Sequence, residues 1–179
     1  MPAVETPDFS LRAATALDAA VLAELAGRIF WDTFAPDNDP VQLTRHIAEV
    51  FTAERVAAEL ADPNVHYLIV EAAGTAVAFA MVERTTPADI GTGPAIFLHR
   101  FYVERSWHGR GIAQALLAAV EDVARGWGGE RLRLTVWEHN VRAIAFYTKV
   151  GFERVGQAPY QLGDELQTDF VLDKRLTPG

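Results

Sequence analysis

Cysteine is absent from this chain of 179 residues. Its absence excludes disulfide bridges, thiolate metal ligands and a cysteine nucleophile, and it suits the reducing conditions of the cytoplasm. The sequence also lacks an apolar run close to the ~20 residues that span a bilayer. Its first residues, MPAVETPDFS, lack the basic and apolar regions of a secretory signal. We therefore expect a cytoplasmic protein without a membrane partner.

A surplus of basic residues is missing too. The chain carries 16 Lys and Arg residues against 24 Asp and Glu residues, a formal net charge of −8. Binding of nucleic acid through its phosphates depends on clustered basic side chains, so we expect no nucleic-acid partner. The acidic balance favours cationic small molecules, and it also serves solubility. The histidines at 46, 66, 108 and 139 lack the spacing of metal ligands, so we predict no metal site.

Internal repeats, low-complexity tracts and linkers are likewise missing, and 50% of the residues are hydrophobic, enough for a sizeable core. We expect one domain over residues 1–179. Hydrophobic spacing predicts strands and helices, with the polar segment 31–40 as a connection. The expected strands are 9–11, 65–71, 75–84, 95–103, 131–137, 152–160 and 166–176, and the expected helices are 15–30, 41–62 in two pieces, 112–125 and 141–150. This order predicts a mixed sheet with helices on both faces.

Two glycines flank an arginine in FYVERSWHGRGIAQALL, residues 101–117, where a strand turns into a helix. Such a turn lets the backbone approach a phosphate, and the first helical N–H groups point at the anion. A P-loop would need lysine followed by serine or threonine, which are missing here. A dinucleotide site would need glycine or alanine where Gln114 stands. Glu138 could still serve as the ribose-binding acid of that site, so an oxidoreductase remains an alternative.

The same turn resembles motif A of the GCN5-related N-acetyltransferases (GNAT family), whose pattern is Gln/Arg-x-x-Gly-x-Gly/Ala. In this chain the motif runs His108, Gly109, Arg110, Gly111, Ile112, Ala113. Histidine stands where the family has glutamine or arginine. Downstream, NVRAIAFYTKVGF, residues 140–152, resembles motif B of the family. Both signatures occur at the right separation, and the order of the expected elements is that of the family, so the resemblance covers essentially the whole chain.

The resemblance implies an α/β (α+β) fold with one mixed, mostly antiparallel sheet of about seven strands and helices on both faces. It implies an N-acetyltransferase that moves the acetyl group of acetyl-CoA to a primary amine by direct attack. Acetyl-CoA would be the co-substrate, and no metal would be needed. A non-catalytic acyl-CoA-binding regulatory module is the alternative within this fold. Exposed edge strands allow a homodimer.

The acetyl-CoA site implied by the resemblance extends from the end of the strand through the turn to the start of motif B. N–H groups of residues 109–114 would bind the pyrophosphate. Backbone groups of the strand would bind the pantetheine, and an asparagine side chain would contact the cofactor. The residues are Phe101, Tyr102, Val103, His108, Gly109, Arg110, Gly111, Ile112, Ala113, Gln114 and Asn140. Arg100, Arg105 and Arg110 against Glu104 make this segment locally basic, which suits an anion.

Tyr147 matches the acid tyrosine of motif B, which would protonate the leaving sulfur. An alkylamine has a pKa around 10, so a base must remove a proton before the nitrogen can attack. His99 is the first candidate, because it lies four residues before Val103 in a strand whose alternate side chains would face the acceptor. Glu83, at the end of the preceding strand, is the second candidate, and Glu138 is the third.

In this family the acceptor site is built by the N-terminal helices and their loop, here FWDTFAPDNDP. Trp31 and Phe34, together with Asp32, Asp37 and Asp39, combine aromatic rings with carboxylates, which suits a cationic amine. The same residues also fit core and turn positions. The segments WDTF, ELADPN and HRFYVERSWHGRGIA resemble a bacterial group that includes spermidine/spermine N-acetyltransferases. We therefore expect a small amine, such as a polyamine, as the acceptor.

Overall fold

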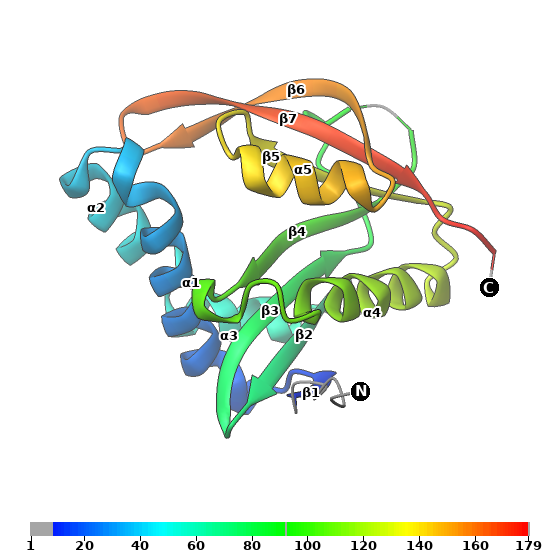
Figure 1. Cartoon of the computed structure of the whole chain (residues 1–179), viewed down its shortest axis with the longest axis horizontal. Coiled ribbons are helices and arrows are strands. Elements are labelled where there is room, and N and C mark those ends of the chain that lie inside the picture. Colours follow the sequence, from blue (N-terminus) through cyan, green and yellow to red (C-terminus); the bar gives the residue numbers. More distant parts are fainter. Residues whose placement is uncertain (1–8, 92, 179) are drawn as a thin grey trace, which may run out of the picture.

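A computed structural model describes residues 9–91 and 93–178. Its centre is a seven-stranded sheet with the strand order β1-β2-β3-β4-β5-β7-β6 (Figure 1). The strands are β1 (Phe9–Ala13), β2 (Val65–Ala72), β3 (Thr75–Glu83), β4 (Ile96–Val103), β5 (Arg131–Trp137), β6 (Glu153–Leu162) and β7 (Glu165–Arg175). Neighbouring strands are antiparallel except for β4 and β5, which are parallel. The mixed, mostly antiparallel sheet of seven strands is confirmed.

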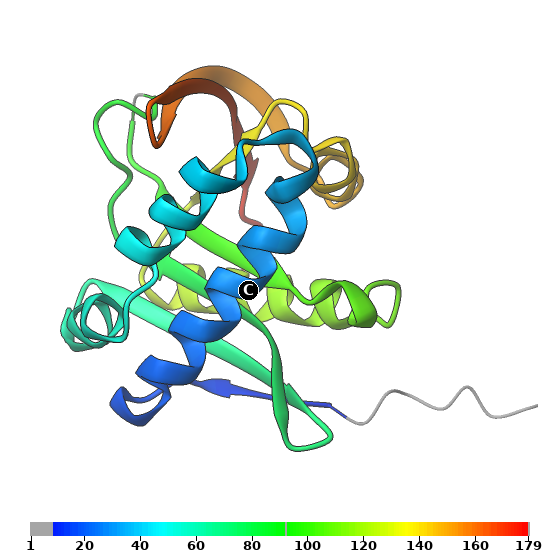
Figure 2. The ribbon, with the colours of Figure 1, turned by 90° about the vertical axis from the view of Figure 1, so that its left-hand side faces the viewer.

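Helices cover both faces of this sheet, as predicted. They are α1 (Ala19–Phe34), α2 (Pro40–Val50), α3 (Ala53–Ala61), α4 (Ile112–Gly126) and α5 (Val141–Lys149). Residues of α1, α2 and α3 pack into one hydrophobic core, and residues of α4 and α5 pack into another. Figure 2 looks onto the side of α1, with α1 to α3 in blue and cyan. Among the helices of the described residues, none is both long and apolar enough to cross a membrane.

Helix α1 runs further than the sequence predicts. It ends at Phe34 and is followed by a 3₁₀ turn at Ala35–Asp37. The predicted connection over 31–40 is therefore wrong for its first four residues. Phe30 and Phe34 lie one turn apart, and their ring centroids are 4.4 Å apart, so packing on the inner face continues the helix. Trp31 follows Phe30 on another side of the helix and is 37% exposed.

Strand β4 is irregular at His99. Arg100 pairs with Met81 of β3 and Leu98 pairs with Val82, so His99 has no partner in the register. One extra residue in a strand reverses the alternation of side chains between the two faces. Leu98 belongs to the core that includes α4, whereas Tyr102 packs against the core that includes α1. The simple alternation that was expected from His99 to Val103 is therefore wrong.

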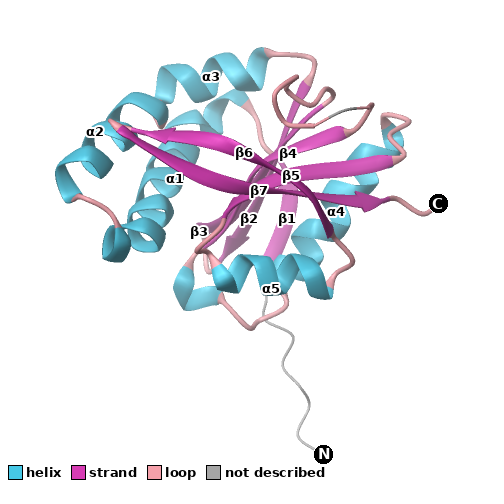
Figure 3. Ribbon diagram, turned by 90° about the horizontal axis from the view of Figure 1, so that it is seen from above, coloured by secondary structure: helices cyan, strands magenta, loops and turns pink. Residues whose placement is uncertain are grey.

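The sheet opens between β4 and β5. These strands pair at only two positions, Ile96 with Leu132 and Phe97 with Arg133. Beyond that point β4 continues beside β3, and β5 continues beside β7, which forms a long hairpin with β6 (Figure 3). Among the described residues, the edges of β4 and β5 that face each other therefore lack strand partners, and their backbone groups are available to a ligand.

Candidate active site

A cavity of about 700 Å³ lies at the opening between β4 and β5. Residues from both faces of the sheet line it. Those on the side of the N-terminal helices include Phe30, Phe34 and Tyr160, and those on the side of α4 and α5 include Gly111, Asn140 and Tyr147. The motif A turn, the motif B helix and the N-terminal helices, which lie far apart in the sequence, therefore meet at one cavity.

The glycine turn at the start of α4 forms part of this cavity. Gly109 and Gly111 have φ angles of 76° and 81°, which favour glycine. Apart from the adjacent residues, no heavy atom of the described part of the chain lies within 4 Å of the place a Cβ would take at either residue. Gly111 is the N-cap of α4, and no side chain at this position accepts a hydrogen bond from the first N–H groups of the helix. The first N–H groups of a helix have no partner within it, so those of residues 112–114 are available. Open space, free donors and a helix N-terminus fit the pyrophosphate of acetyl-CoA.

Arginines surround this turn, but they are not all the ones expected. Arg105 and Arg142 line the cavity, and Arg110 packs over the Trp107 ring at 4.8 Å. Arg100 lines the cavity as well, but its charge is already paired. Its side chain is 5% exposed and forms an ion pair with Glu59 of α3 at 2.7 Å. Glu59 therefore offsets the charge that Arg100 brings to the cavity, and Arg142, which stands within motif B and also lines the cavity, was overlooked.

His108, the residue that departs from motif A, turns its ring inward. Its Nε2 lies 2.8 Å from the carbonyl oxygen of Val103. Because a carbonyl only accepts hydrogen bonds, this nitrogen carries the proton and donates. Burial lowers the pKa of His108, which keeps the ring neutral at pH 7. The ring thus ties the turn to the end of β4, while its buried Nδ1 has no partner among the described residues.

Most of the other predicted cofactor-binding residues line the cavity. Phe101, Tyr102 and Val103 line the cavity along the open edge of β4, and Ala113 and Gln114 line it at the start of α4. The side chain of Ile112 is buried in the core, so only its backbone belongs to the turn, and the Arg110 side chain does not line the cavity.

Asn140 is the N-cap of α5. Its Oδ1 accepts a hydrogen bond of 3.2 Å from the backbone N–H of Ala143. The residue also lines the cavity. Capping fixes the side chain at the mouth of the site, where its amide group can donate to a ligand.

Tyr147 is buried on α5 at the wall of the cavity. Its ring lies 6.1 Å from that of Phe101, and no described residue forms a hydrogen bond with its hydroxyl. Burial raises the pKa of Tyr147 well above its usual range, with a smaller contribution from Tyr102. The phenol therefore stays protonated at neutral pH and can donate a proton into the cavity.

The candidate bases from the sequence occupy two different places. His99 lines the cavity, and its Nδ1 lies 3.2 Å from Oε2 of Glu83, so these two candidates form one pair. The His99 side chain is 41% exposed. Glu83 does not line the cavity, and Glu138 lies beyond the end of β5 in a neighbouring pocket.

Asp169 of β7 lines the cavity and was missed in the sequence. It is 8% exposed, and its carboxylate accepts a hydrogen bond from Thr135. Burial raises the pKa of Asp169 to about 6; the Thr135 hydrogen bond opposes this shift, and the charge of Glu138 adds to it. A signal was present, because Asp169 alternates with Val171 and Asp173 on one face of a strand, and acidic residues are rare at buried positions.

The predicted acceptor residues are only partly brought together. Phe34 and Asp32 line the cavity, and the Phe34 ring lies 5.5 Å from that of Trp137. Trp31 does not line it. Asp39 instead caps α2, where its Oδ1 accepts hydrogen bonds from the backbone N–H groups of residues 41 and 42 at 3.0 and 2.9 Å. Nearby, Nε2 of His46 lies 2.9 Å from the Tyr160 hydroxyl, which links α2 to β6.

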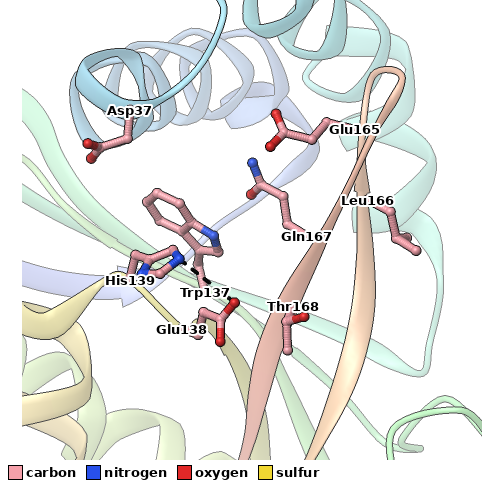
Figure 4. A pocket seen from close by; sticks show the side chains of 8 residues that line it. All are labelled: Asp37, Trp137, Glu138, His139, Glu165, Leu166, Gln167 and Thr168. Carbon is pink, nitrogen blue, oxygen red and sulfur yellow. Dashed lines mark ion pairs between the residues drawn. The ribbon is translucent and has the colours of Figure 1, made fainter.

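A second pocket of about 560 Å³ shares Trp137 and Gln167 with the cavity. Figure 4 shows the indole of Trp137 between the carboxylates of Asp37, Glu138 and Glu165 (Figure 4). We call it the acidic pocket. An aromatic face among carboxylates is suited to an ammonium group, through both cation–π and ionic interactions.

Comparison with known proteins shows similarity to one family of acetyltransferases. Residues 27–152 match the model of the Acetyltransferase (GNAT) family. An uncharacterized N-acetyltransferase of Lactobacillus delbrueckii subsp. lactis is 29% identical over 82% of this chain and 86% of its own length. The uncharacterized N-acetyltransferase Rv2669 of Mycobacterium tuberculosis is 31% identical over 89% and 98% of the two chains. The PaiA N-acetyltransferase of Thermoplasma acidophilum, solved with coenzyme A, superposes with a TM-score of 0.77 at 21% identity, covering 94% and 99% of the two chains.

Proposed function

Because this chain belongs to the GNAT acetyltransferase family and is an acetyl-CoA-dependent N-acetyltransferase, we propose that its acceptor is a small polyamine. The acidic pocket beside the cavity carries this proposal. The family assignment argues against the two alternative functions that the sequence left open, an oxidoreductase and a non-catalytic module. A cytoplasmic location, a single domain over 1–179 and a homodimer remain predictions from the sequence.

We propose that acetyl-CoA binds along the open edge of β4 and over the glycine turn. The backbone N–H groups of residues 109–114 bind its pyrophosphate, and Arg105 and Arg142 add positive charge. Residues 101–103 and Asn140 bind the pantetheine. Their support is the unpaired edge of β4 and the position of these residues on the cavity wall.

Tyr147 is proposed as the acid that protonates the sulfur when the thioester breaks. Its support is a buried, protonated hydroxyl that lines the cavity and has no hydrogen-bond partner among the described side chains. The chain contains no cysteine that could carry the acetyl group, which supports direct attack of the amine on the thioester.

A polyamine explains why the acidic pocket adjoins the cavity. One ammonium group would sit beside Trp137, Asp37 and Glu165 in the pocket, while the amine to be acetylated reaches the opening between β4 and β5. The acidic pocket and the cavity share the lining residues Trp137 and Gln167, and this supports the binding of two charged groups on one flexible chain.

The test is a panel of amines measured by release of CoA. Spermidine and 1,4-diaminobutane are compared with propylamine, which has one charge, with kanamycin and with a peptide bearing a free N-terminus. We expect the highest kcat/KM for spermidine. Spermidine at background beside turnover of another amine would contradict the polyamine proposal.

A variant tests the acidic pocket itself. Glu165→Gln removes one of its carboxylates and should raise the KM for spermidine severalfold, because a charged contact is lost, while the KM for propylamine stays unchanged. Glu130→Gln, at an exposed position outside the pocket, is the matched control. Equal effects of Glu165→Gln on both amines would contradict the pocket's role.

A further inference from the structure

Two aspartates on one face of β7 differ in their ion pairs. Asp173 is buried and forms ion pairs with Arg131 and Arg133 at 2.6 and 2.7 Å. Asp169 is also buried, yet no cationic side chain of the described residues pairs with it. A buried carboxylate without a cation costs free energy. The unpaired one is the one that lines the cavity.

The groups that act on Asp169 are neutral or negative. Thr135 of β5 donates a hydrogen bond to it, and Glu138 beyond the end of β5 repels it. Tyr102 of β4 and Tyr160 of β6 face it, and burial raises the pKa of both tyrosines, to about 12 for Tyr102. From α2, His46 reaches only the Tyr160 hydroxyl. Asp32 of α1 lines the same cavity. Arg100 of β4 lines the same cavity but is paired with Glu59, so no cation of the described residues forms an ion pair with Asp169.

Asp169 and Tyr147 lie on opposite faces of the sheet. Asp169 shares a face with Thr135 and Tyr160, on the side of the N-terminal helices, since the registers place it beside Trp137 and Ala158. Tyr147 belongs to the core on the side of α5. Tyr102, between them on β4, interacts electrostatically with both. An amine that enters from the side of α1 therefore meets Asp169 before it reaches the opening between β4 and β5.

We infer that Asp169 receives the ammonium group of the acceptor and removes its proton. This inference rests on the proposed N-acetylation of a cationic amine, but it does not require that amine to be a polyamine. The carboxylate takes one proton from R–NH₃⁺, and the freed nitrogen pair forms the C–N bond to the acetyl carbon. The C–S bond breaks with its electron pair on sulfur, which takes the Tyr147 proton. A second proton from nitrogen restores the Tyr147 hydroxyl, and Asp169 then releases its proton to water.

His99 is the competing base, and its surroundings argue for a different role. Its side chain is far more exposed than Asp169, and Glu83 already occupies its Nδ1 side at 3.2 Å. Because Glu83 and His99 already interact with each other, neither lacks a partner for its charge. Asp169 lacks such a partner within the described residues, and the ammonium group of the acceptor would supply it.

The experiment measures kcat/KM for the best amine of the panel from pH 5 to pH 10. In the wild type we expect a bell-shaped profile, because Asp169 must be ionised and the amine must arrive protonated; the acidic limb lies near pH 6. Asp169→Asn should lower the maximum about 100-fold. It should also abolish the acidic limb, so that activity rises steadily as the free amine forms. Asp122→Asn, on the exposed face of α4, is the matched control.

A second variant keeps Asp169 in place. Thr135→Val removes the hydrogen bond that lowers the pKa of Asp169, so the acidic limb should move to higher pH while acetyl-CoA affinity stays the same. The inference is wrong if the acidic limb of Thr135→Val does not move, or if the kcat/KM of Asp169→Asn stays within twofold of the wild type with the same pH profile. Either result leaves the proposed function standing. If the wild type acetylates no amine of the panel, the proposed function fails and the inference fails with it.

Discussion

The guanidinium of Arg100 donates a hydrogen bond of 2.7 Å to Glu59, which joins β4 to α3 across 41 residues of sequence. Tyr67 of β2 contacts both groups, donating to Glu59 at 2.5 Å. The buried charge of Arg100 is therefore balanced at the edge of the site.

Removing the carboxylate of Glu59 should destabilise the protein. Glu59→Gln leaves the Arg100 charge buried without its counter-ion, which costs about 3 kcal/mol of unfolding free energy. Urea denaturation measures the loss. Glu54→Gln, on the exposed side of the same helix, is the control and should cost much less. A Glu59→Gln protein as stable as this control would mean that Arg100 is not held by the pair.

Tyr147→Phe should lower kcat about 100-fold and leave the Kd for acetyl-CoA nearly unchanged. The variant removes only the hydroxyl, and the ring keeps its packing against Phe101. Steady-state kinetics and calorimetry with acetyl-CoA separate the two quantities. Unchanged turnover would remove Tyr147 from the chemistry, and lost affinity would assign it to binding.

Gly111→Ala should weaken acetyl-CoA binding. A Cβ there enters the open space of the turn, and the positive φ costs about 1–2 kcal/mol for any other residue. Gly74 in the β2–β3 hairpin has a similar φ of 75° and equally open space, so Gly74→Ala carries the same strain away from the site. Calorimetry should show weaker binding for Gly111→Ala only. Equal binding by both variants would mean that the turn does not hold the cofactor.

Asp169→Asn should stabilise the free enzyme at neutral pH. The pKa of Asp169 is raised to about 6 in the folded protein from 3.8, so between pH 4 and pH 6 the unfolded chain loses this proton first and stability falls as pH rises. At pH 7 the cost is on the order of 3 kcal/mol. The variant should therefore be more stable than the wild type at pH 7 and no more stable below pH 4. Thermal unfolding at both pH values tests this; a gap that is the same at both would contradict the raised pKa.

Local patterns predicted most of the fold, because the alternation of strands and the spacing of helices depend on near neighbours. Leu132, Leu134 and Val136 lie in the core as their alternation indicates. Long-range pairing was beyond such patterns. The bulge at His99 depends on the register with β3, and α1 continues to Phe34 because Phe34 packs beside Phe30 and Trp137.

The site follows the same division. The glycine turn and the Asn140 cap are local, so their sequences indicate them directly. The position of Asp169 in the site depends on the pairing of β7 with β5 and on the nearness of Tyr102. Both involve residues more than 30 positions away in the sequence. A buried strand position occupied by aspartate is a signal that could have singled it out.

The opening between β4 and β5 also bears on the order of events during turnover. Because residues from both faces of the sheet line the cavity, we expect the two reactants to approach it from opposite faces, so that neither has to leave before the other arrives. Both are then present at once, and double-reciprocal plots of the initial rates should intersect instead of running parallel. CoA and the acetylated amine can then leave from opposite faces of the sheet. The acetylated amine should therefore not compete with acetyl-CoA for its binding site.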